Sequence, residues 1–315
     1  MSPNSWICLH PSNATQTTVS LDNRGLAYGD GFFTTMGVID GQILWLDYHQ
    51  QRLVSHATAL QLQLDSQLLL AMLKIHAKQL QQGMLKLIIT RAEQEVRGYG
   101  YTPNTGGGSA CEIWLKSSPM AITTARSLPL ADGQFIPLQP AASAICLSSQ
   151  IACLPPTLAG LKSLNRLDNV LASGELQAIK AKTLAGTIKP SIAEGLLRDM
   201  SGQWVEGTMS NVFYQLVEAP VAKSSNRPHS QNNSNYLTQG QWYTPSMAQS
   251  GVAGVMRQVI IDTLSTSNNP VIIRSLQDED LPHLSQLFFC NALRGIMPMS
   301  SLRLLSGEVV SFEAI

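Results

Sequence analysis

One lysine, Lys162, follows an apolar, glycine-containing stretch and precedes a run of polar residues. The stretch reads LAGLKSLNRLDNV over residues 158–170. A protonated lysine amine is a poor nucleophile, and desolvation in an apolar pocket lowers its pKa and allows it to form a Schiff base. Lys162 is therefore a candidate anchor for a carbonyl cofactor. The alternative is a solvated surface lysine, which is the commoner situation for this residue type.

Other short segments with polar or glycine residues occur on both sides of Lys162. They are Asp22–Thr35 (DNRGLAYGDGFFTT), His49–Leu53 (HQQRL), Arg97–Tyr99 (RGY), Val205–Phe213 (VEGTMSNVF) and Gly251–Arg257 (GVAGVMR). In this order and at these distances, the segments resemble the fold-type IV pyridoxal-phosphate enzymes. That family includes the branched-chain aminotransferases, the D-amino-acid aminotransferases and the aminodeoxychorismate lyases. The resemblance runs from about residue 20 to about residue 300.

Within the family, three segments are most similar to the aminodeoxychorismate lyases: Gly29–Thr35, Gly160–Leu167 and Cys290–Ala292. The resemblance implies 4-amino-4-deoxychorismate as substrate, with 4-aminobenzoate and pyruvate as products on the route to folate. Thr34 stands where the aminotransferases of the family commonly have Glu, which favours the lyase branch. A D-amino-acid or branched-chain aminotransferase stays open as an alternative, as does a carrier of pyridoxal phosphate without turnover.

The same resemblance implies pyridoxal 5′-phosphate as cofactor and suggests which residues contact it. Lys162 supplies the amine and then takes a proton from the substrate, and Glu206 pairs with the pyridine nitrogen so that the ring accepts electrons. Arg52 and the backbone N–H groups at a helix start bind the phosphate. The remaining expected contacts are Ser210, Asn211, Gly254, Val255, Met256 and Asn291. Without the resemblance, Arg52 is better interpreted as a surface helix arginine and Glu206 as an exposed carboxylate in a strand turn.

The substrate carries carboxylates, so the pocket needs cationic and polar groups. Arg97 and Tyr99 match the Arg-Gly-Tyr loop of the family, which reaches the active site and, in some members, the site of the partner subunit. Tyr28 and Thr34 match positions that line the cofactor cleft in relatives. The alternative for Arg97 is an arginine in a glycine-containing surface loop.

The bulk composition narrows the class of protein. The chain has 315 residues, of which 44% are hydrophobic and 13% charged, and its formal net charge is zero. It therefore shows no basic face for nucleic acid, no polybasic anchor for a membrane, and no apolar run near the roughly 20 residues that span a bilayer. The low charge and the family both favour a homodimer.

The cysteines and histidines suggest no metal site. The five cysteines are scattered without a Cys-x-x-Cys pair, and the six histidines show no ligand spacing. Free thiols in a reducing cytoplasm are the simplest interpretation, and the first residues lack the pattern of a signal peptide.

The secondary structure expected around these residues is that of an α/β (α+β) protein of the fold-type IV class. We expect strands at Thr17–Leu21, Phe32–Ile39 and Ile43–Leu46, with an Asp40–Gly41 hairpin turn. Helical spacing covers Tyr48–Leu60, Ser66–Gln81, Leu164–Lys182 and Met256–Ser265, and further strands are expected at Met84–Thr90 and Cys111–Lys116.

These elements divide into domains with the cofactor expected in the cleft between them. A small N-terminal α/β domain covers residues 1–125, a proline-containing linker covers 126–142, and a larger C-terminal domain of short strands and helices covers 143–315. Residues 181–194 and 219–241 resemble insertions. The second is poor in apolar residues, which predicts a long surface loop.

Overall fold

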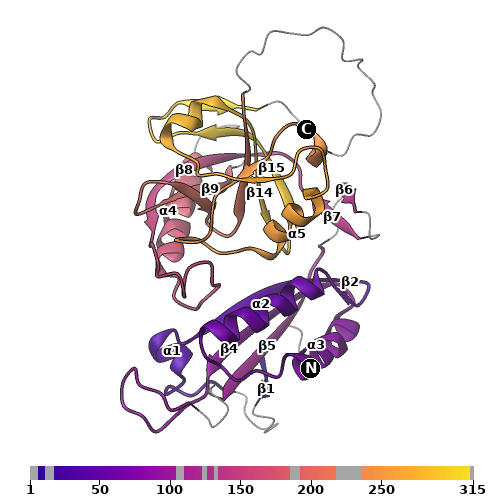
Figure 1. The fold of residues 1–315 in the computed structure, drawn as a ribbon, viewed down its shortest axis with the longest axis vertical. Helices are drawn as coiled ribbons and strands as arrows, with labels where there is room; N and C mark the ends of the chain where they lie inside the picture. Colours follow the sequence, from indigo (N-terminus) through magenta and orange to yellow (C-terminus); the bar gives the residue numbers. More distant parts are fainter. Residues whose placement is uncertain are drawn as a thin grey trace. The chain divides into compact units, whose positions relative to one another are not determined.

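The chain folds into two compact units in the computed structural model. The structure describes residues 6–10, 18–103, 110–122, 126–130, 134–184, 192–217 and 236–312. The first unit comprises Met1–Thr123 together with Gly160–Arg166, and the second comprises Thr124–Ala159 and Leu167–Ile315 (Figure 1). The segment that carries Lys162 therefore belongs to the first unit, although the chain on both sides of it belongs to the second. From the sequence alone, that segment is expected to belong with residues 143–315.

The first unit is an antiparallel sheet with helices packed on it. Its strands run in the order β1-β5-β4-β2-β3 within the described residues. The strands are β1 Trp6–His10, β2 Gly31–Ile39, β3 Gln42–Ile43, β4 Gly83–Arg91 and β5 Cys111–Pro119, and the helices are α1 Arg24–Tyr28, α2 Leu46–Ala59 and α3 Ser66–Leu80. These bounds confirm the strands predicted near 32–39, 84–90 and 111–116 and the two helices predicted from the apolar spacing.

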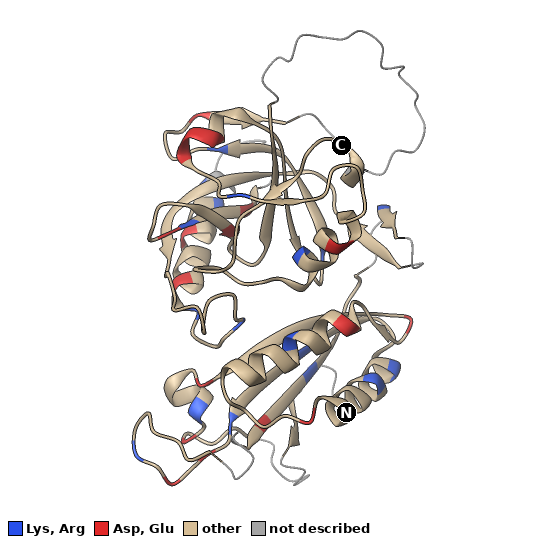
Figure 2. Cartoon of the chain, viewed as in Figure 1, with Lys and Arg blue, Asp and Glu red and all other residues tan. Residues whose placement is uncertain are grey.

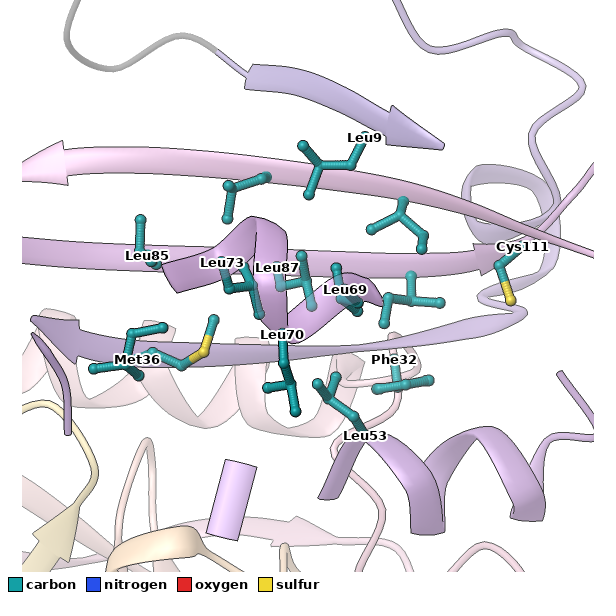
Figure 3. Packing of buried hydrophobic residues seen from close by; sticks show 14 of the residues in the cluster. Leu9, Phe32, Met36, Leu53, Leu69, Leu70, Leu73, Leu85, Leu87 and Cys111 are labelled. Carbon is teal, nitrogen blue, oxygen red and sulfur yellow. The ribbon is translucent and has the colours of Figure 1, made fainter. Parts of the chain in front are cut away.

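A single core joins the sheet to α2 and α3. Figure 3 shows Leu53 of α2 and Leu70 and Leu73 of α3 near Phe32 and Met36 of β2 and Leu85 and Leu87 of β4. All of these side chains are buried. Their burial is the main stabilising contribution, because apolar area removed from water contributes about 25 cal/mol per Å². The core therefore fixes the face of α2 that meets the sheet.

Local backbone chemistry explains where the first unit agrees with the sequence and where it differs. Asp40 and Gly41 have φ angles of 50° and 70°, as the predicted two-residue hairpin turn requires. The strand predicted at Thr17–Leu21 is wrong over its described residues, which form bends and turns. Asn23 follows them and accepts the N–H of Leu26, and this cap begins the short helix α1 instead. The strand predicted at Ile43–Leu46 ends early, because α2 begins at Leu46.

The second unit is built on a sheet that closes into a ring. Pairing runs β8-β9-β10-β11 and returns through β14 and β15 to β8. The remaining strands, β6, β7, β12, β13 and β16, extend this ring at its sides. The strands are β6 Arg126–Pro129, β7 Phe135–Leu138, β8 Ala142–Ile151, β9 Ile192–Asp199, β10 Trp204–Gly207, β11 Asn211–Leu216, β12 Tyr243–Thr244, β13 Ile272–Ile273, β14 Leu284–Asn291, β15 Gly295–Arg303 and β16 Val309–Ser311. The helices are α4 Leu167–Leu184 and α5 Val255–Leu264, with 3₁₀ turns η1 Tyr236–Thr238 and η2 Asp278–His283.

The range expected to be a linker contains strands. Residues 126–142 include β6, β7 and the first residue of β8, and Leu138 of β7 pairs with Ile296 of β15. Proline signals an interruption in the sequence, but it is tolerated near the edge of a sheet, and β6 and β7 lie at one end of the strand order. The buried side chains of Ile136 and Leu138 hold this pair to the unit.

The two predicted insertions fall mostly outside the described residues. Residues 185–191 and 219–235 are not described, so the long surface loop expected there stays a prediction. The described start of the first insertion continues α4 to Leu184, and β9 begins at Ile192.

The described residues also bear on the bulk expectations. All five cysteines are free thiols. Basic and acidic residues are interspersed along the elements of both units (Figure 2). No described helix combines the length and the apolar character needed to cross a membrane. Among the described residues, His, Cys, Asp and Glu form no group of three or more that could hold a metal ion.

Candidate functional site

The segment that carries Lys162 lies along β2. The N–H of Phe33 donates to the carbonyl of Lys162 at 3.0 Å, and the N–H of Leu164 donates to the carbonyl of Gly31 at 3.0 Å. Phe32 and Ser163 form an isolated antiparallel bridge between the two stretches. The segment around Lys162 therefore pairs with the first residues of β2 as a short strand would, on the side of β2 that β4 does not occupy.

The side chain and the N–H of Lys162 have separate partners. Lys162 Nζ lies 4.6 Å from the centroid of the Phe33 ring, at a distance typical of a cation–π contact. Lys86 Nζ lies 5.5 Å from the same centroid. The N–H of Lys162 donates to Nε2 of His56 at 2.9 Å. Lys162 is half-buried, so it is not the fully solvated lysine of the alternative interpretation.

Helix α2 presents three polar residues on its buried face. His49, Arg52 and His56 follow the i, i+3, i+7 spacing of one helix face, and all three are buried. Arg52 is only 7% exposed, and burial lowers its pKa to about 10. The interpretation of Arg52 as a surface residue is thereby excluded, and the arginine is available only to groups that reach this face.

The two histidines of this face are neutral. Burial, reinforced by the positive charges of Arg52 and Lys162, lowers the pKa of His49 well below its ordinary value. Burial and the charges of Arg52, Arg166 and Lys162 lower the pKa of His56 to about 3. Nε2 of His49 has no hydrogen-bond partner among the described residues. The first unit thus gathers cations beside uncharged imidazoles, and this arrangement suits an anionic ligand.

The predicted substrate residues of the first unit fall into two places. Thr34 is fully buried, and its Oγ1 lies 3.0 Å from Nδ1 of His49. Tyr28 and Tyr99 form an edge-to-face pair with ring centroids 5.3 Å apart, and Tyr99 is 85% exposed. Arg97 is exposed in the same loop. The structure therefore brings Tyr28 and Tyr99 together and puts Thr34 beside His49 of α2.

Arg24, which the sequence analysis did not select, holds the loop of Arg97 and Tyr99. Its guanidinium donates to Asp30 at 3.0 Å and to the carbonyls of Gly98 and Tyr99 at 3.4 and 3.2 Å. The only signal in the sequence is its place in the Asp22–Thr35 segment, because the loop that it binds lies more than 70 residues away.

Glu206 lies in the second unit, on strand β10. It is 3% exposed, and its Oε2 accepts the N–H of Val252 at 2.8 Å. Gly251, with a φ angle of 76°, makes this approach possible, since a Cβ there would lie 3.0 Å from Oε2. The interpretation of Glu206 as an exposed carboxylate is therefore excluded. A buried carboxylate aimed by a backbone N–H can accept a further proton donor, such as a pyridinium N–H.

A second buried carboxylate, Glu194, holds the turn after Glu206. Its Oε1 accepts the N–H of Thr208 at 3.0 Å and the hydroxyl of Thr208 at 2.5 Å, and its Oε2 accepts the hydroxyl of Ser210 at 2.7 Å. The hydroxyl of Ser210 is thus engaged within the protein. Glu194 was missed because its partners lie in the turn between β10 and β11, 14 to 16 residues along the chain.

Asn211 faces Glu206 in the strand pairing and positions the start of α5. Asn211 Nδ2 donates to the carbonyl of Val252 at 2.8 Å. Gly254 is the N-cap of α5 and provides no side-chain cap, and a Cβ at this position would collide with Oδ1 of Asn211. The first N–H groups of α5, which include those of Val255 and Met256, have no intrahelical acceptors and so suit an anion.

Asn291, at the end of β14, is occupied by its own turn. Its Oδ1 accepts the N–H groups of Leu293 and Arg294 at 3.1 and 2.8 Å. Several of the predicted residues thus adjoin one another within each unit. Lys162 and Thr34 adjoin the buried face of α2 with Arg52, whereas Glu206, Asn211 and Gly254 adjoin one another in the second unit.

Known proteins with similar sequences and folds cover nearly the whole chain. The family model described as amino-transferase class IV matches residues 31–302. An aminodeoxychorismate lyase of Vibrio harveyi is 24% identical over 288 residues, which cover 91% of this chain and 88% of the relative. A crystal structure of 4-amino-4-deoxychorismate lyase from Pseudomonas aeruginosa is similar with a TM-score of 0.69 and 29% identity, covering 94% of this chain and 90% of that one. The branched-chain amino acid aminotransferase of Escherichia coli shares the fold, with a TM-score of 0.63 and 19% identity over 90% of this chain and 81% of that one.

Proposed function

The chain belongs to the class IV amino-transferase family, and on that premise we propose that it is a pyridoxal-phosphate-dependent 4-amino-4-deoxychorismate lyase. The observation that carries the proposal is the 29% identity to the lyase of Pseudomonas aeruginosa over 94% of the chain. The match to the lyase of Vibrio harveyi over 91% of the chain supports the same branch. The fold alone does not choose a reaction, because related folds carry several.

The residues present fit pyridoxal phosphate. The phosphate is dianionic, and two kinds of anion-binding group are available: Arg52 on the buried face of α2 and the uncapped start of α5 at Gly254. The unpartnered Nε2 of His49 adds a buried polar atom to the face of Arg52. The buried carboxylate of Glu206 fits the protonated pyridine nitrogen. Ser210 and Asn211 act by holding these groups, since their own side chains are engaged with Glu194 and Val252.

Lys162 performs the proton transfer in the proposed reaction. When bound, pyridoxal phosphate supplies an electron-withdrawing ring that accepts the electron pair left at the amine-bearing carbon of the substrate. Lys162 Nζ takes the proton from that carbon. The bond to the enolpyruvyl oxygen then breaks, enolpyruvate leaves with the bonding electron pair, and the remaining ring becomes that of aromatic 4-aminobenzoate. The proton held by Lys162 returns to the products, and protonated enolpyruvate becomes pyruvate. Aromatisation makes the elimination favourable, so the protein mainly orients groups and controls protons.

Glu206 has the task of holding a proton on the pyridine nitrogen. Hydrogen bonds from the N–H of Val252 and from the side-chain amide of Asn169 fix the orientation of its carboxylate. Arg97, Tyr99 and Tyr28 are proposed to contact the substrate, and Thr34 to shape its site through His49. A homodimer, in which the exposed loop of Arg97 and Tyr99 could serve either subunit, stays a prediction.

The alternative within the family is an aminotransferase for D-amino or branched-chain substrates. It would use Lys162 and Glu206 in the same way but would return the proton to the cofactor and need an oxo acid as acceptor. A carrier of pyridoxal phosphate without turnover is less consistent with a buried Glu206, because storage requires no partner for the pyridine nitrogen.

Separate incubations with the two kinds of candidate substrate test the proposal. The protein loaded with pyridoxal phosphate is incubated with 4-amino-4-deoxychorismate alone, and separately with leucine or D-alanine plus 2-oxoglutarate. We expect equal amounts of 4-aminobenzoate and pyruvate in the first mixture and no glutamate in the second. Glutamate formation without 4-aminobenzoate would move the assignment to the aminotransferases.

A further inference from the structure

We propose that His56 is a positioning residue for Lys162: its imidazole, held in one tautomer by Ser55, fixes the main chain that carries the reactive amine. The proposal rests on the proposed function in one respect, namely that Lys162 is the reactive group. The hydrogen bonds on which it depends lie within the first unit and are independent of any ligand.

The contacts of His56 define its tautomer. A backbone N–H can only donate, so Nε2 of His56 must be the unprotonated nitrogen that accepts from Lys162 at 2.9 Å. The proton therefore resides on Nδ1, which lies 3.2 Å from Oγ of Ser55. The hydroxyl of Ser55 donates to the carbonyl of Arg52 at 3.2 Å, so its oxygen is free to accept from Nδ1–H. The three hydrogen bonds therefore form a chain: the N–H of Lys162 donates to His56, His56 donates to Ser55, and Ser55 donates to the carbonyl of Arg52.

The surroundings keep this imidazole neutral. His56 is 5% exposed, and burial together with the positive charges of Arg52, Arg166 and Lys162 lowers its pKa to about 3. A protonated imidazole would direct an N–H at the N–H of Lys162 and break the contact. The same cations that suit an anionic ligand thus preserve the lone pair that holds Lys162.

The other side of the Lys162 residue is held by β2. The N–H of Phe33 donates to the carbonyl of Lys162, and the ring of Phe33 lies against Nζ. With both main-chain groups engaged, motion of the amine is limited to the rotations of its own side chain. This matters because a misplacement of 1 Å in a catalytic group can cost about 100-fold in rate.

Two substitutions separate the hydrogen bond from the packing of the ring. His56 also contacts Phe32 edge to face at 5.3 Å, and both His56→Gln and His56→Leu lose that contact. Only His56→Gln keeps an acceptor that can reach the N–H of Lys162. The difference between the two variants therefore measures the acceptor. Val54→Ala is the matched control, because Val54 lies on the same helix and is 47% exposed.

The first measurement is hydrogen exchange at the backbone amide of Lys162 in the full-length protein without cofactor. We expect a protected amide in the wild type, in Val54→Ala and in His56→Gln. In His56→Leu the exchange should be faster by about tenfold or more, because opening of this segment no longer breaks a hydrogen bond. Unchanged exchange in His56→Leu would overturn the proposal.

The second measurement loads the same proteins with pyridoxal phosphate and follows the rate of 4-aminobenzoate formation and the KM. We expect kcat to fall roughly 10- to 100-fold in His56→Leu with little change in KM, and His56→Gln to recover most of it. A loss of amide protection with kcat unchanged would also overturn the positioning role. If the wild type forms no 4-aminobenzoate, the proposed function fails, whereas the exchange data still decide whether His56 holds Lys162.

Discussion

At the scale of single residues, the candidate chemistry depends on a division between contacts that hold a residue in place and the side-chain group that reacts. The peptide groups of Lys162 are bound by His56 and Phe33, and its amine is left near an aromatic ring. The buried carboxylate of Glu206 accepts the N–H of Val252 and the side-chain amide of Asn169. In both cases hydrogen bonds to other elements of the same unit fix the position of the residue.

Replacement of Lys162 by alanine tests this division. We expect Lys162→Ala to lower the rate of 4-aminobenzoate formation by roughly 1,000-fold or more, because a positioned proton-transfer group contributes about 10²- to 10⁴-fold. Lys86→Ala is the control, since Lys86 Nζ lies 5.5 Å from the same Phe33 ring. Steady-state assays at saturating cofactor make the comparison, and an equal loss in both variants would contradict the assignment to Lys162.

The neutral state of His56 predicts a pH dependence of stability. Its pKa is about 3 in the folded protein and near the ordinary 6.5 when unfolded, so between these values only the unfolded chain binds the proton. The free energy of unfolding therefore falls as the pH drops from about 6.5 towards 3, and this one group should cost about 2 kcal/mol at pH 5. His49, with a lowered pKa, acts with the same sign.

Urea titrations of the wild type and His56→Gln at pH 7 and pH 5 measure this effect. The wild type should lose more stability than the variant on acidification, because the glutamine has no proton to bind. Equal losses in the two proteins would show that His56 is not held neutral by the fold.

The residues that the sequence could and could not identify differ in a physical way. Lys162, Arg52 and Glu206 stand in recognisable motifs, and the burial of Arg52 and Glu206 is consistent with their expected roles. The engagement of Ser210 by Glu194, and of Lys162 by His56, depends on hydrogen bonds between separate elements. The sequence offers no metal-ligand role for His56, because the histidines lack the spacing of metal ligands. Its position four residues after Arg52 nevertheless predicts that both lie on one helix face.

At the scale of elements, helix α5 and the β10–β11 turn form one hydrogen-bonded construction in the second unit. Asn211 of β11 binds the carbonyl of Val252, and the adjoining N–H of Val252 binds Glu206. Glu194 of β9 holds the turn between the strands. The start of α5 therefore has its position set by strands that also carry the candidate partner of the pyridine nitrogen.

Gly254→Ala should disturb this construction. A Cβ at Gly254 would collide with Oδ1 of Asn211, so we expect at least tenfold weaker binding of pyridoxal phosphate, equivalent to about 1.4 kcal/mol. Gly174→Ala in α4 is the matched control, because no atom of the described residues lies within 4 Å of the position that its Cβ would take. That change should stabilise the protein by up to about 1 kcal/mol. Fluorescence titration with the cofactor measures the affinity, and unaltered binding by Gly254→Ala would contradict a phosphate role for the α5 start.

Elements with strong periodicity were predictable, whereas those defined by caps or by pairing were not. Apolar spacing predicts α2 and α3 to within a few residues, and the Asp-Gly dipeptide between two apolar runs predicts the turn at Asp40–Gly41. Helix α1 was missed, because it depends on the Asn23 cap and has few residues. Strands β6 and β7 were missed, because their prolines resemble a linker until the pairing with β15 is known.

At the scale of the whole molecule, the chain passes between the two units more than once. It passes from the first unit to the second, returns to the first for Gly160–Arg166, and then leaves again. The mixed α/β class was predictable from composition and periodicity. The return of this segment was not, because it is held by contacts such as the one between Lys162 and His56, which are 106 residues apart.

This path predicts that the N-terminal part cannot be separated without loss. A fragment of residues 1–123 would leave the carbonyl of Gly31 and the N–H of Phe33 without their partners at the edge of β2. Unpaired strand edges promote association, so we expect a lower Tm and self-association of the fragment. The same fragment joined through a glycine-serine linker to residues 160–166 should recover both properties. Sedimentation and thermal melts compare the two, and identical behaviour would argue against the segment as part of the first unit.

The most direct test of the central claim is the chemical location of the bound cofactor. The protein loaded with pyridoxal phosphate is reduced with borohydride, digested, and its peptides are weighed. We predict that the pyridoxyl mass lies on Lys162 and that the Lys162→Ala variant carries none at a stoichiometric level. A stoichiometric label on any other lysine, or no label in the wild type, would contradict the account.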